Sequence, residues 1–382
     1  MLPDPLSSSS SIPSTPPDSL LAPYDAIVVL SFGGPENADE VLPFLRRVTA
    51  GRDVPEERLV EVAAHYDRFG GRSPINDQNR ALIERLDSAL RDRGIAVPVV
   101  LGNRNSAPFL VDTLTELLDV GHARLLVVTT SAYSSYSGCR QYRENLAEAL
   151  TLAQERTGST AVVDKVRPYA GHPGFVAAQV ARLTEAVQAG ADLRNGQLLW
   201  VTHSIPESMA LTSGPGDADA DLYVDQHQRL AAAIERAASQ ELGIAVEGEL
   251  VFCSRSGPPQ QPWLEPDVVH RIQELAAQGV ASVTVVPIGF ISDHMEVISD
   301  LDLDAVDAGR AAGIPVVRVR TVGTHPAFVE GLVDLLLERA AQARGVPVMP
   351  ADAIGGDLRP AVCDAGCCPN LRVALPALCG KD

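Results

Sequence analysis

The stretch VTVVPIGFISDHMEVISDLDLDA, residues 283–305, indicates most clearly which class of fold this chain adopts. Its opening run of β-branched residues predicts a buried strand, and a Pro-Gly break ends that strand. An acidic segment follows, and we predict that it is helical. In open α/β sheets, ligands bind beyond the carboxyl ends of the strands. The sequence therefore places a candidate site at Asp293, His294 and Glu296.

The acidic segment repeats a carboxylate every four residues. Glu296, Asp300 and Asp304 would stack along one face of an α-helix, with Asp293 one turn earlier. Such a row repels itself by a few tenths of a kcal/mol per pair, so solvent, a cation or passing protons must offset the repulsion. An ordinary solvated helix face is one interpretation. A path for a cation or for protons is the one that we favour.

The composition describes an acidic protein with enough apolar residues for two cores. The chain has 382 residues, 46% of them hydrophobic, and a net charge of −18, which argues against a nucleic-acid partner. No apolar run approaches the roughly 20 residues that cross a bilayer. Residues 1–23 are Ser/Pro-rich and lack the pattern of a signal peptide. We expect that segment to be disordered and the protein to be cytoplasmic.

Strand-like and helix-like segments alternate along the chain, which indicates parallel sheets covered by helices. Residues 121–135 also align with residues 279–293, which suggests two lobes of one plan. The predicted fold is α/β, with two Rossmann-like lobes, each a parallel doubly wound sheet, and a cysteine-rich tail. The predicted divisions are a tail at 1–23, a first lobe at 24–169, a second lobe at 170–325, and a final helix and tail at 326–382.

Three further features bear on chemistry. His203 follows a predicted strand in the segment THSIP, where it suits a base or a metal ligand, although a structural histidine is as plausible. Arginines gather between Arg46 and Arg85 and suit an anionic ligand, with surface ion pairs as the alternative. The segment SAYSSYSGCRQYREN, residues 131–145, offers hydroxyl groups and flat rings to a ring-shaped ligand.

Six cysteines are unevenly placed. Cys139 and Cys253 stand alone, whereas Cys363, Cys367, Cys368 and Cys379 lie within the last twenty residues. A disulfide framework is not expected in a reducing compartment. Closely spaced thiolates favour zinc or an iron–sulfur cluster.

Five motifs, in order, resemble those of the ferrochelatase family. They are SFGGPE (31–36), GGRSPIN (70–76), VTHSIP (201–206), SRSGPPQQPWLEPD (254–267) and GFISDHMEVISDLD (289–302). The resemblance spans residues 24–343 and implies an enzyme that inserts ferrous iron into a porphyrin held between two Rossmann-like lobes. It matches His203 to the active-site histidine and Glu296 to the carboxylate across the cleft. Asp300 and Asp304 match an acidic line leading outward, where the family often has Glu at the position of Asp304.

The reaction adds a dication and removes two pyrrole protons, so it needs a neutral base and carboxylates. We expect His203 to accept the protons and Glu296 to deliver iron or relay protons, or the two roles to be exchanged. The predicted metal contacts are His203, Glu296, Asp300 and Asp304.

The identity of the porphyrin is inferred from the segment 44–74. This segment is charged, whereas membrane-associated relatives have an apolar lip there. The resemblance therefore favours coproporphyrin III, with Arg52, Ser73 and Tyr133 as predicted propionate contacts. Phe32 stands where some soluble relatives have tyrosine, which excludes an axial phenolate. Alternatives are protoporphyrin IX, a cobalt or nickel tetrapyrrole chelatase, and a non-catalytic tetrapyrrole carrier or haem sensor. A monomer without membrane association is expected.

The cysteine tail resembles that of chelatases that carry a 2Fe-2S cluster, in which one internal cysteine joins three near the C-terminus. The predicted ligands are Cys139, Cys363, Cys367 and Cys368, with Cys379 able to replace one of the last two. Zinc remains the alternative occupant.

Overall fold

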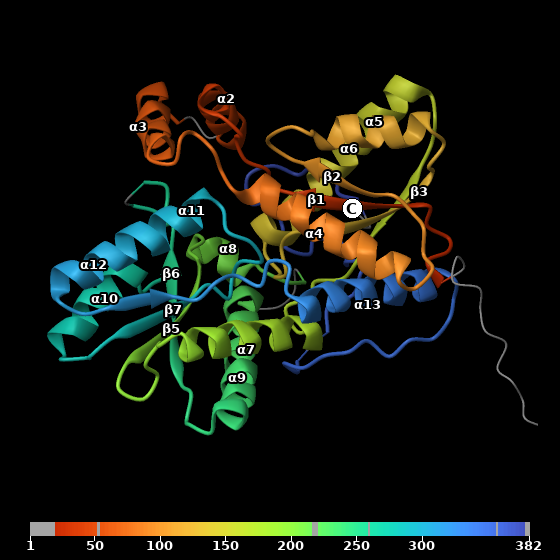
Figure 1. Cartoon of the computed structure of the whole chain (residues 1–382). Helices are drawn as coiled ribbons and strands as arrows, with labels where there is room; N and C mark the ends of the chain where they lie inside the picture. Colours follow the sequence, from red (N-terminus) through yellow and green to blue (C-terminus); the bar gives the residue numbers. More distant parts are fainter. Residues whose placement is uncertain (1–19, 52–53, 216–220, 259, 357, 379–382) are drawn as a thin grey trace, which may run out of the picture.

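A computed structural model describes residues 20–51, 54–215, 221–258, 260–356 and 358–378 (Figure 1). Arg52 and Cys379 therefore lie outside the described residues, as do residues 1–19.

The first half of the chain alternates strands and helices. Its elements are β1 (Ala26–Ser31), α2 (Ala38–Val48), α3 (Glu56–Asp67), α4 (Ile75–Arg91), β2 (Val99–Asn103), α5 (Leu110–Asp119), β3 (Arg124–Thr129), the π-helix η1 (Tyr136–Arg140), α6 (Gln141–Thr157) and β4 (Val162–Lys165).

The second half repeats the alternation and ends in a long helix. Its elements are α7 (Pro173–Gln188), β5 (Gln197–His203), α8 (Glu207–Leu211), α9 (Leu222–Leu242), β6 (Gly248–Cys253), α10 (Val268–Ala277), β7 (Val283–Val286), α11 (Met295–Val297), the π-helix η2 (Ile298–Asp304), α12 (Ala305–Ala312), β8 (Val316–Arg318) and α13 (Pro326–Ala343).

Two four-stranded parallel sheets have the same topology. The strand orders are β2-β1-β3-β4 and β6-β5-β7-β8. The strands β3 and β7, which align in the sequence, thus occupy equivalent places, and the prediction of two α/β lobes is confirmed. In the first sheet the strand order reverses between β1 and β3, because the chain adds β2 on one side of β1 and β3 on the other. Sheets of this kind bind ligands at such a point. In the second sheet that point lies between β5 and β7.

Alternating side chains place each sheet between two apolar layers. In β1, Val28 and Leu30 face α5 and α6, while Ile27 and Val29 face the opposite side. The second sheet does the same, with α10 and α12 on its outer face. The inner layers of both sheets belong to one continuous core.

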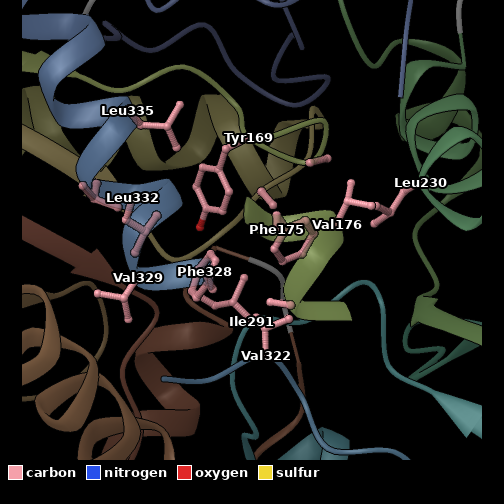
Figure 2. Close-up of a cluster of buried hydrophobic side chains, with 14 of the residues drawn as sticks. Tyr169, Phe175, Val176, Leu230, Ile291, Val322, Phe328, Val329, Leu332 and Leu335 are labelled. Atoms are coloured by element: carbon pink, nitrogen blue, oxygen red, sulfur yellow. The ribbon is translucent and has the colours of Figure 1, made fainter. Parts of the chain in front are cut away.

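The C-terminal helix joins the lobes. Helix α13 packs on α7 of the second lobe and on α4 of the first, and it lies between them in Figure 1. Phe328 of α13 contacts Phe175 and Tyr169 at ring-centroid distances of 5.7 and 6.1 Å (Figure 2). The sheets fall within the two predicted lobes. The exact domain boundaries stay predictions.

The predicted disorder of residues 1–23 is wrong for its last part. Leu21 is buried in the inner core, and the side chain of Arg344 donates hydrogen bonds to the carbonyl oxygens of Leu20 and Ala22. Leu20 also packs against this core, so the apolar pair at the end of the Ser/Pro-rich run belongs to the folded part of the chain.

Helices α2 and α3 form a hairpin with a small apolar core of its own. Val41, Phe44, Leu45, Leu59 and Tyr66 enclose Met295 of the second lobe. Figure 1 shows the hairpin standing over the end of α11. Within the described part of the chain, no helix combines the length and apolarity needed to cross a bilayer.

Candidate active site

His203 is the last residue of β5 and reaches the switch point of the second sheet. Its Nδ1 contacts the carbonyl oxygen of Ser204. Because a carbonyl only accepts, Nδ1 carries the proton, and the lone pair of the neutral ring lies on Nε2. Ser204 is held in turn, since its N–H donates to Cys253 (2.7 Å) and its Oγ donates to Leu264 (2.8 Å). The imidazole therefore has a fixed tautomer and a fixed direction.

Glu296 lies directly beside His203. Its Oε2 is 3.4 Å from Nε2 of His203, and their side chains are 57% and 30% exposed. Burial lowers the pKa of His203, but the hydrogen bond and charge of Glu296 outweigh it, so the pKa lies above its usual value. The expected placement of Glu296 across a cleft is wrong. Both residues belong to the second lobe, because β5 and β7 are adjacent, and no ring fits between them.

Asp300 continues from Glu296 on the π-helix η2. Ser254, which has a left-handed backbone (φ 60°), donates a hydrogen bond to its Oδ2. Burial raises the pKa of Asp300 to about 6, and the charge of Glu296 contributes in the same direction. The carboxyl group is therefore poised to gain or lose a proton near neutral pH.

The expected α-helical row is only partly present. Residues 298–304 form a π-helix, whose wider turns do not stack residues four apart as an α-helix does. Asp304 is exposed to solvent. Among the residues described, no three His, Cys, Asp or Glu side chains converge as ligands of a single ion. The four predicted metal contacts thus run outward from His203 instead of surrounding one point.

Asp293 does not join the row, contrary to expectation. Arg318 of β8 donates to Asp293 (2.9 Å) and, through two nitrogens, to Asp302 (2.7 and 2.8 Å). Thr321 adds a hydrogen bond to Asp293. Arg318 therefore holds both ends of the segment that carries Glu296 and Asp300.

His294 flanks Glu296 on its other side. Its Nδ1 lies 3.9 Å from Oε2 of Glu296, and its ring contacts Phe290 edge-on at 5.1 Å. Burial lowers the pKa of His294, and the nearby His203 acts in the same direction. The sequence placed His294 at the candidate site, and the structure puts it beside Glu296 there.

The first lobe approaches this site through aromatic side chains. Phe44 contacts Phe32 at 5.9 Å and Tyr66 at 6.5 Å, both edge-on. Burial raises the pKa of Tyr66 well above its usual value, and the negative charge of Glu296 adds to the effect. Tyr66 therefore lies within electrostatic reach of the carboxylate.

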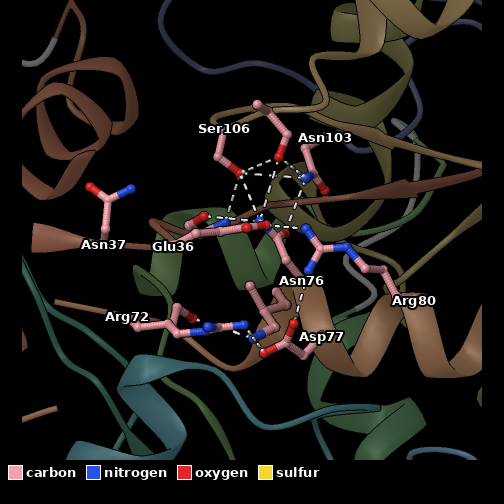
Figure 3. Close-up of polar contacts among 12 residues, drawn as sticks. Glu36, Asn37, Arg72, Asn76, Asp77, Arg80, Asn103 and Ser106 are labelled. Atoms are coloured by element: carbon pink, nitrogen blue, oxygen red, sulfur yellow. Dashed lines mark hydrogen bonds and ion pairs between the residues drawn. The ribbon is translucent and has the colours of Figure 1, made fainter. Parts of the chain in front are cut away.

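A buried polar network shapes the end of β1. Asn76 donates to the carbonyl of Gly34 (3.1 Å) and to Glu36 (3.0 Å), and its Oδ1 accepts from Asn103 (Figure 3). Gly33 has φ +79°, and a Cβ there would come within 2.5 Å of Oγ of Ser106. The GGP turn thus depends on glycine.

The predicted propionate contacts are not supported by their positions. Ser73 is 4% exposed and packs against Gly34. Tyr133 is 3% exposed, and its hydroxyl donates to Ile288 at 2.5 Å. The third, Arg52, is outside the described residues.

Most of the clustered arginines make contacts within the protein. Arg46 pairs with Glu56, Arg72 with Asp77, and Arg80 with Glu36 and Asp77. Arg47 donates to the carbonyl of Asn105 at 2.8 Å. Ion pairing and internal hydrogen bonds thus account for these four guanidinium groups.

The four predicted cluster cysteines come together. Cys139, Cys363, Cys367 and Cys368 form a buried group with free thiols, although Cys139 belongs to the first lobe and the others to the tail. Cys253 is also free and buried, but it lies beside Ser254.

Positive groups surround the buried thiols. Hydrogen bonds with Cys139 and Cys367 lower the pKa of Cys363, and the charges of Lys165 and Arg143 lower it further. Arg359 contacts Sγ of Cys367 at 3.6 Å. The pKa of Cys368 is lowered too, by its hydrogen bond with Cys367, whereas hydrogen bonds with Cys363 raise the pKa of Cys139 and Cys367. The surroundings thus favour the thiolate, the form that binds metals, at Cys363 and Cys368.

Ser254 and Arg318 are the site residues that the sequence analysis missed. Ser254 was visible inside the SRSGPP motif, but nothing in the sequence ties it to Asp300. Arg318 sits on an edge strand, and only the pairing of β7 with β8 brings it to Asp293.

The fold and the site define an α/β enzyme of the chelatase class. The ferrochelatase family model matches residues 24–340, and the chain belongs to this family. Similar proteins include three named coproporphyrin III ferrochelatase. That of Streptomyces griseus subsp. griseus is 50% identical, covering 94% of this chain and 97% of that protein. The Streptomyces coelicolor protein is 48% identical (96% and 99%), and the Leifsonia xyli subsp. xyli protein is 46% identical (94% and 94%).

Proposed function

We propose that this protein is a lyase that inserts Fe²⁺ into coproporphyrin III. The products are coproheme and two protons. The contact between His203 and Glu296 at the switch point of the second sheet is the observation that carries the proposal. The names of its close relatives support the same reaction and the same porphyrin.

His203 accepts the pyrrole protons in this proposal. Its Nε2 lone pair is free in the neutral ring, because Nδ1 donates to Ser204. A proton on Nε2 is then stabilised by the carboxylate of Glu296, which lies 3.4 Å away. Glu296 relays the proton outward or releases iron inward. The two roles use the same carboxylate at different moments.

Asp300 and Asp304 extend this route toward solvent. Asp300 has a pKa of about 6, so it can accept a proton and return it near neutral pH. Asp304 is exposed and can exchange protons or iron with water. Oxygen ligands hold ferrous iron weakly compared with four ring nitrogens, which favours transfer to the porphyrin.

The porphyrin lies against the His203 side that faces the α2–α3 hairpin. The exposed charges on this hairpin, such as the Arg46–Glu56 and Arg58–Glu61 pairs, suit a porphyrin with four carboxylates better than an apolar one. Arg52, which falls between these two helices in the sequence, remains our proposed propionate contact. We also infer a monomer in the cytoplasm.

A two-porphyrin metallation assay tests the proposal. Purified protein is mixed anaerobically with Fe²⁺ and either coproporphyrin III or protoporphyrin IX, and the Soret band is followed. We expect faster metallation of coproporphyrin III. Preference for protoporphyrin IX would contradict the substrate, and binding of either porphyrin without metallation would point to a carrier.

We infer that Cys139, Cys363, Cys367 and Cys368 hold a 2Fe-2S cluster. Four buried free thiols from two parts of the chain fit the ligand set of such a cluster. The N–H of Gly214 donates to Sγ of Cys368 at 3.2 Å, as amides do around cluster sulfurs. When bound, the cluster would fasten the tail to the first lobe.

A further inference from the structure

Two series of buried contacts lead from the four clustered cysteines to the strand end that carries His203. Both pass through helix α9 of the second lobe. They do not include Glu296 or the acidic row.

The first series begins at Cys368. Its N–H donates to the carbonyl of Gly214 (2.7 Å), and the N–H of Gly214 donates to its Sγ (3.2 Å). The adjacent Ser213 accepts the N–H of Tyr223 on its Oγ at 2.8 Å. The hydroxyl of Tyr223 then donates to the carbonyl of His203 at 2.9 Å. Three residues, Gly214, Ser213 and Tyr223, thus connect a cysteine thiol to the backbone of the catalytic histidine.

The second series begins at the loop before Cys139. Ser134 exchanges two hydrogen bonds with Gln226, at 2.8 and 3.3 Å. Its neighbour Tyr133 stacks on His227 with ring centroids 3.7 Å apart. This loop is therefore held against the same face of α9.

Both series end at the same place. Nε2 of His227 lies 2.8 Å from Oγ1 of Thr202, and the hydroxyl of Tyr223 lies 2.9 Å from that atom. Thr202, Ser213 and His227 are all at most 1% exposed, so water cannot replace these bonds without local opening.

Cys368 adopts a conformation that needs support. Its φ is 53°, which is unfavourable for a residue with a Cβ. Such a conformation persists only when the surroundings impose it. Loss of a group bound to the thiol would remove one restraint and weaken the reciprocal pair with Gly214.

We propose that Tyr223 is a positioning residue that couples the cysteine-bound group to His203. The inference rests on the proposed function and on the 2Fe-2S assignment. A bound cluster holds Gly214 and Ser213, these hold α9 at Tyr223, and Tyr223 holds the carbonyl of His203. Coupling between two sites is reciprocal. A cluster that favours the binding of porphyrin against His203 is therefore stabilised in turn by the bound porphyrin.

The test measures how fast the cluster is lost. Holoenzyme is incubated with excess iron chelator, with or without iron-free coproporphyrin III, and acid-labile sulfide is measured in desalted samples over time. We expect porphyrin to slow sulfide loss at least about five-fold in the wild type, as for ordinary couplings between sites. In Tyr223→Phe we expect less than about two-fold protection and a lower kcat.

Tyr169→Phe is the matched control. Tyr169 is also buried, and its hydroxyl also donates to a backbone carbonyl, that of Thr129 at 2.8 Å, but it lies on neither series. It should keep the wild-type protection. Equal protection in Tyr223→Phe and wild type would overturn the coupling, as would a wild type that turns over without labile sulfide. A wild type that binds but never metallates porphyrin would instead contradict the proposed function.

Discussion

Nε2 of His203 lies 3.4 Å from Oε2 of Glu296, although the two residues follow different strands of the second sheet. This contact makes the imidazole more basic and gives its proton a place to go. It also means that the two groups act from the same side of the porphyrin.

Replacing His203 by alanine should remove the proton acceptor without removing the binding surface. We expect metallation to fall about 100-fold or more, which is the usual contribution of a general base, while porphyrin still shifts its Soret band on binding. His270→Ala is the control, because that histidine is 78% exposed and remote from the site. Wild-type turnover in His203→Ala would exclude the proposed role.

Asp300→Asn should change how stability depends on pH. Burial raises the pKa of Asp300 to about 6, above roughly 3.9 in the unfolded chain. The protonated carboxyl group of Asp300 therefore stabilises the folded protein fully below about pH 4, and this stabilisation is lost as the pH rises through 6. The melting temperature of the variant, relative to wild type, should increase from pH 4 to pH 7, while its metallation rate falls. A constant difference in melting temperature would contradict the shifted pKa.

Arg318→Met should release both ends of the segment 293–302. Asp293 and Asp302 lose their shared partner, and we expect a loss of about 2 kcal/mol in unfolding free energy, because the groups are only partly buried. The kcat should fall as Glu296 and Asp300 lose their fixed positions, and Arg318→Lys should restore part of it. Denaturant titration and steady-state kinetics measure the two effects.

An exposed ion pair on the next helix provides the comparison for Arg318. Arg310 pairs with Asp307, and both side chains are more than 60% exposed. Arg310→Met should change stability by less than about 0.5 kcal/mol and leave kcat unchanged. Similar losses in both variants would mean that Arg318 has no special role.

Cys363→Ser should abolish the visible absorption of the purified protein. Serine keeps the shape of the side chain but is a poor ligand for iron in a sulfur site. Cys253→Ser is the matched control, since that thiol is equally buried and lies apart from the other four. Iron and labile sulfide should persist in the control. Zinc without sulfide in anaerobically grown wild type would show a different occupant.

Gly33→Ala should destabilise the turn after β1. A positive φ costs about 1 kcal/mol for alanine, and contact with Ser106 and Asn103 adds overpacking. We expect a total of about 3 kcal/mol in urea unfolding. Gly313→Ala has the same φ (+79°) with nothing within 4 Å of its Cβ, so it should lose only about 1 kcal/mol. Equal losses would mean that the surrounding network yields to the methyl group.

Sequence reasoning predicted the strands and the two lobes because buried parallel strands leave apolar runs between polar helices. The final helix was predicted to begin at residue 326, and α13 begins at Pro326. The alignment of residues 121–135 with 279–293 also predicted the equivalence of β3 and β7. These features depend on the local pattern of apolar and polar residues, and this pattern can be read from a single sequence.

What was missed depends on contacts between distant segments. Nothing near Tyr133 in the sequence shows that His227 will stack on it, and nothing near Asp293 shows that Arg318 will pair with it. The π-helical form of residues 298–304 was missed as well, since spacings of four suggest an ordinary helix. Only the packed structure decides these points.

Both lobes place a π-helix in the connection that follows the third strand of the sheet, although in the second lobe the short helix α11 comes before it. In the first lobe it carries the thiol of Cys139, and in the second it carries the carboxylate of Asp300. A repeated architecture has thus been given soft sulfur donors in one copy and hard oxygen donors in the other. If iron binds at both sites, the hardness of the ligands separates its two uses. Soft sulfur ligands would keep iron in the protein, and hard oxygen ligands would pass it on to the porphyrin.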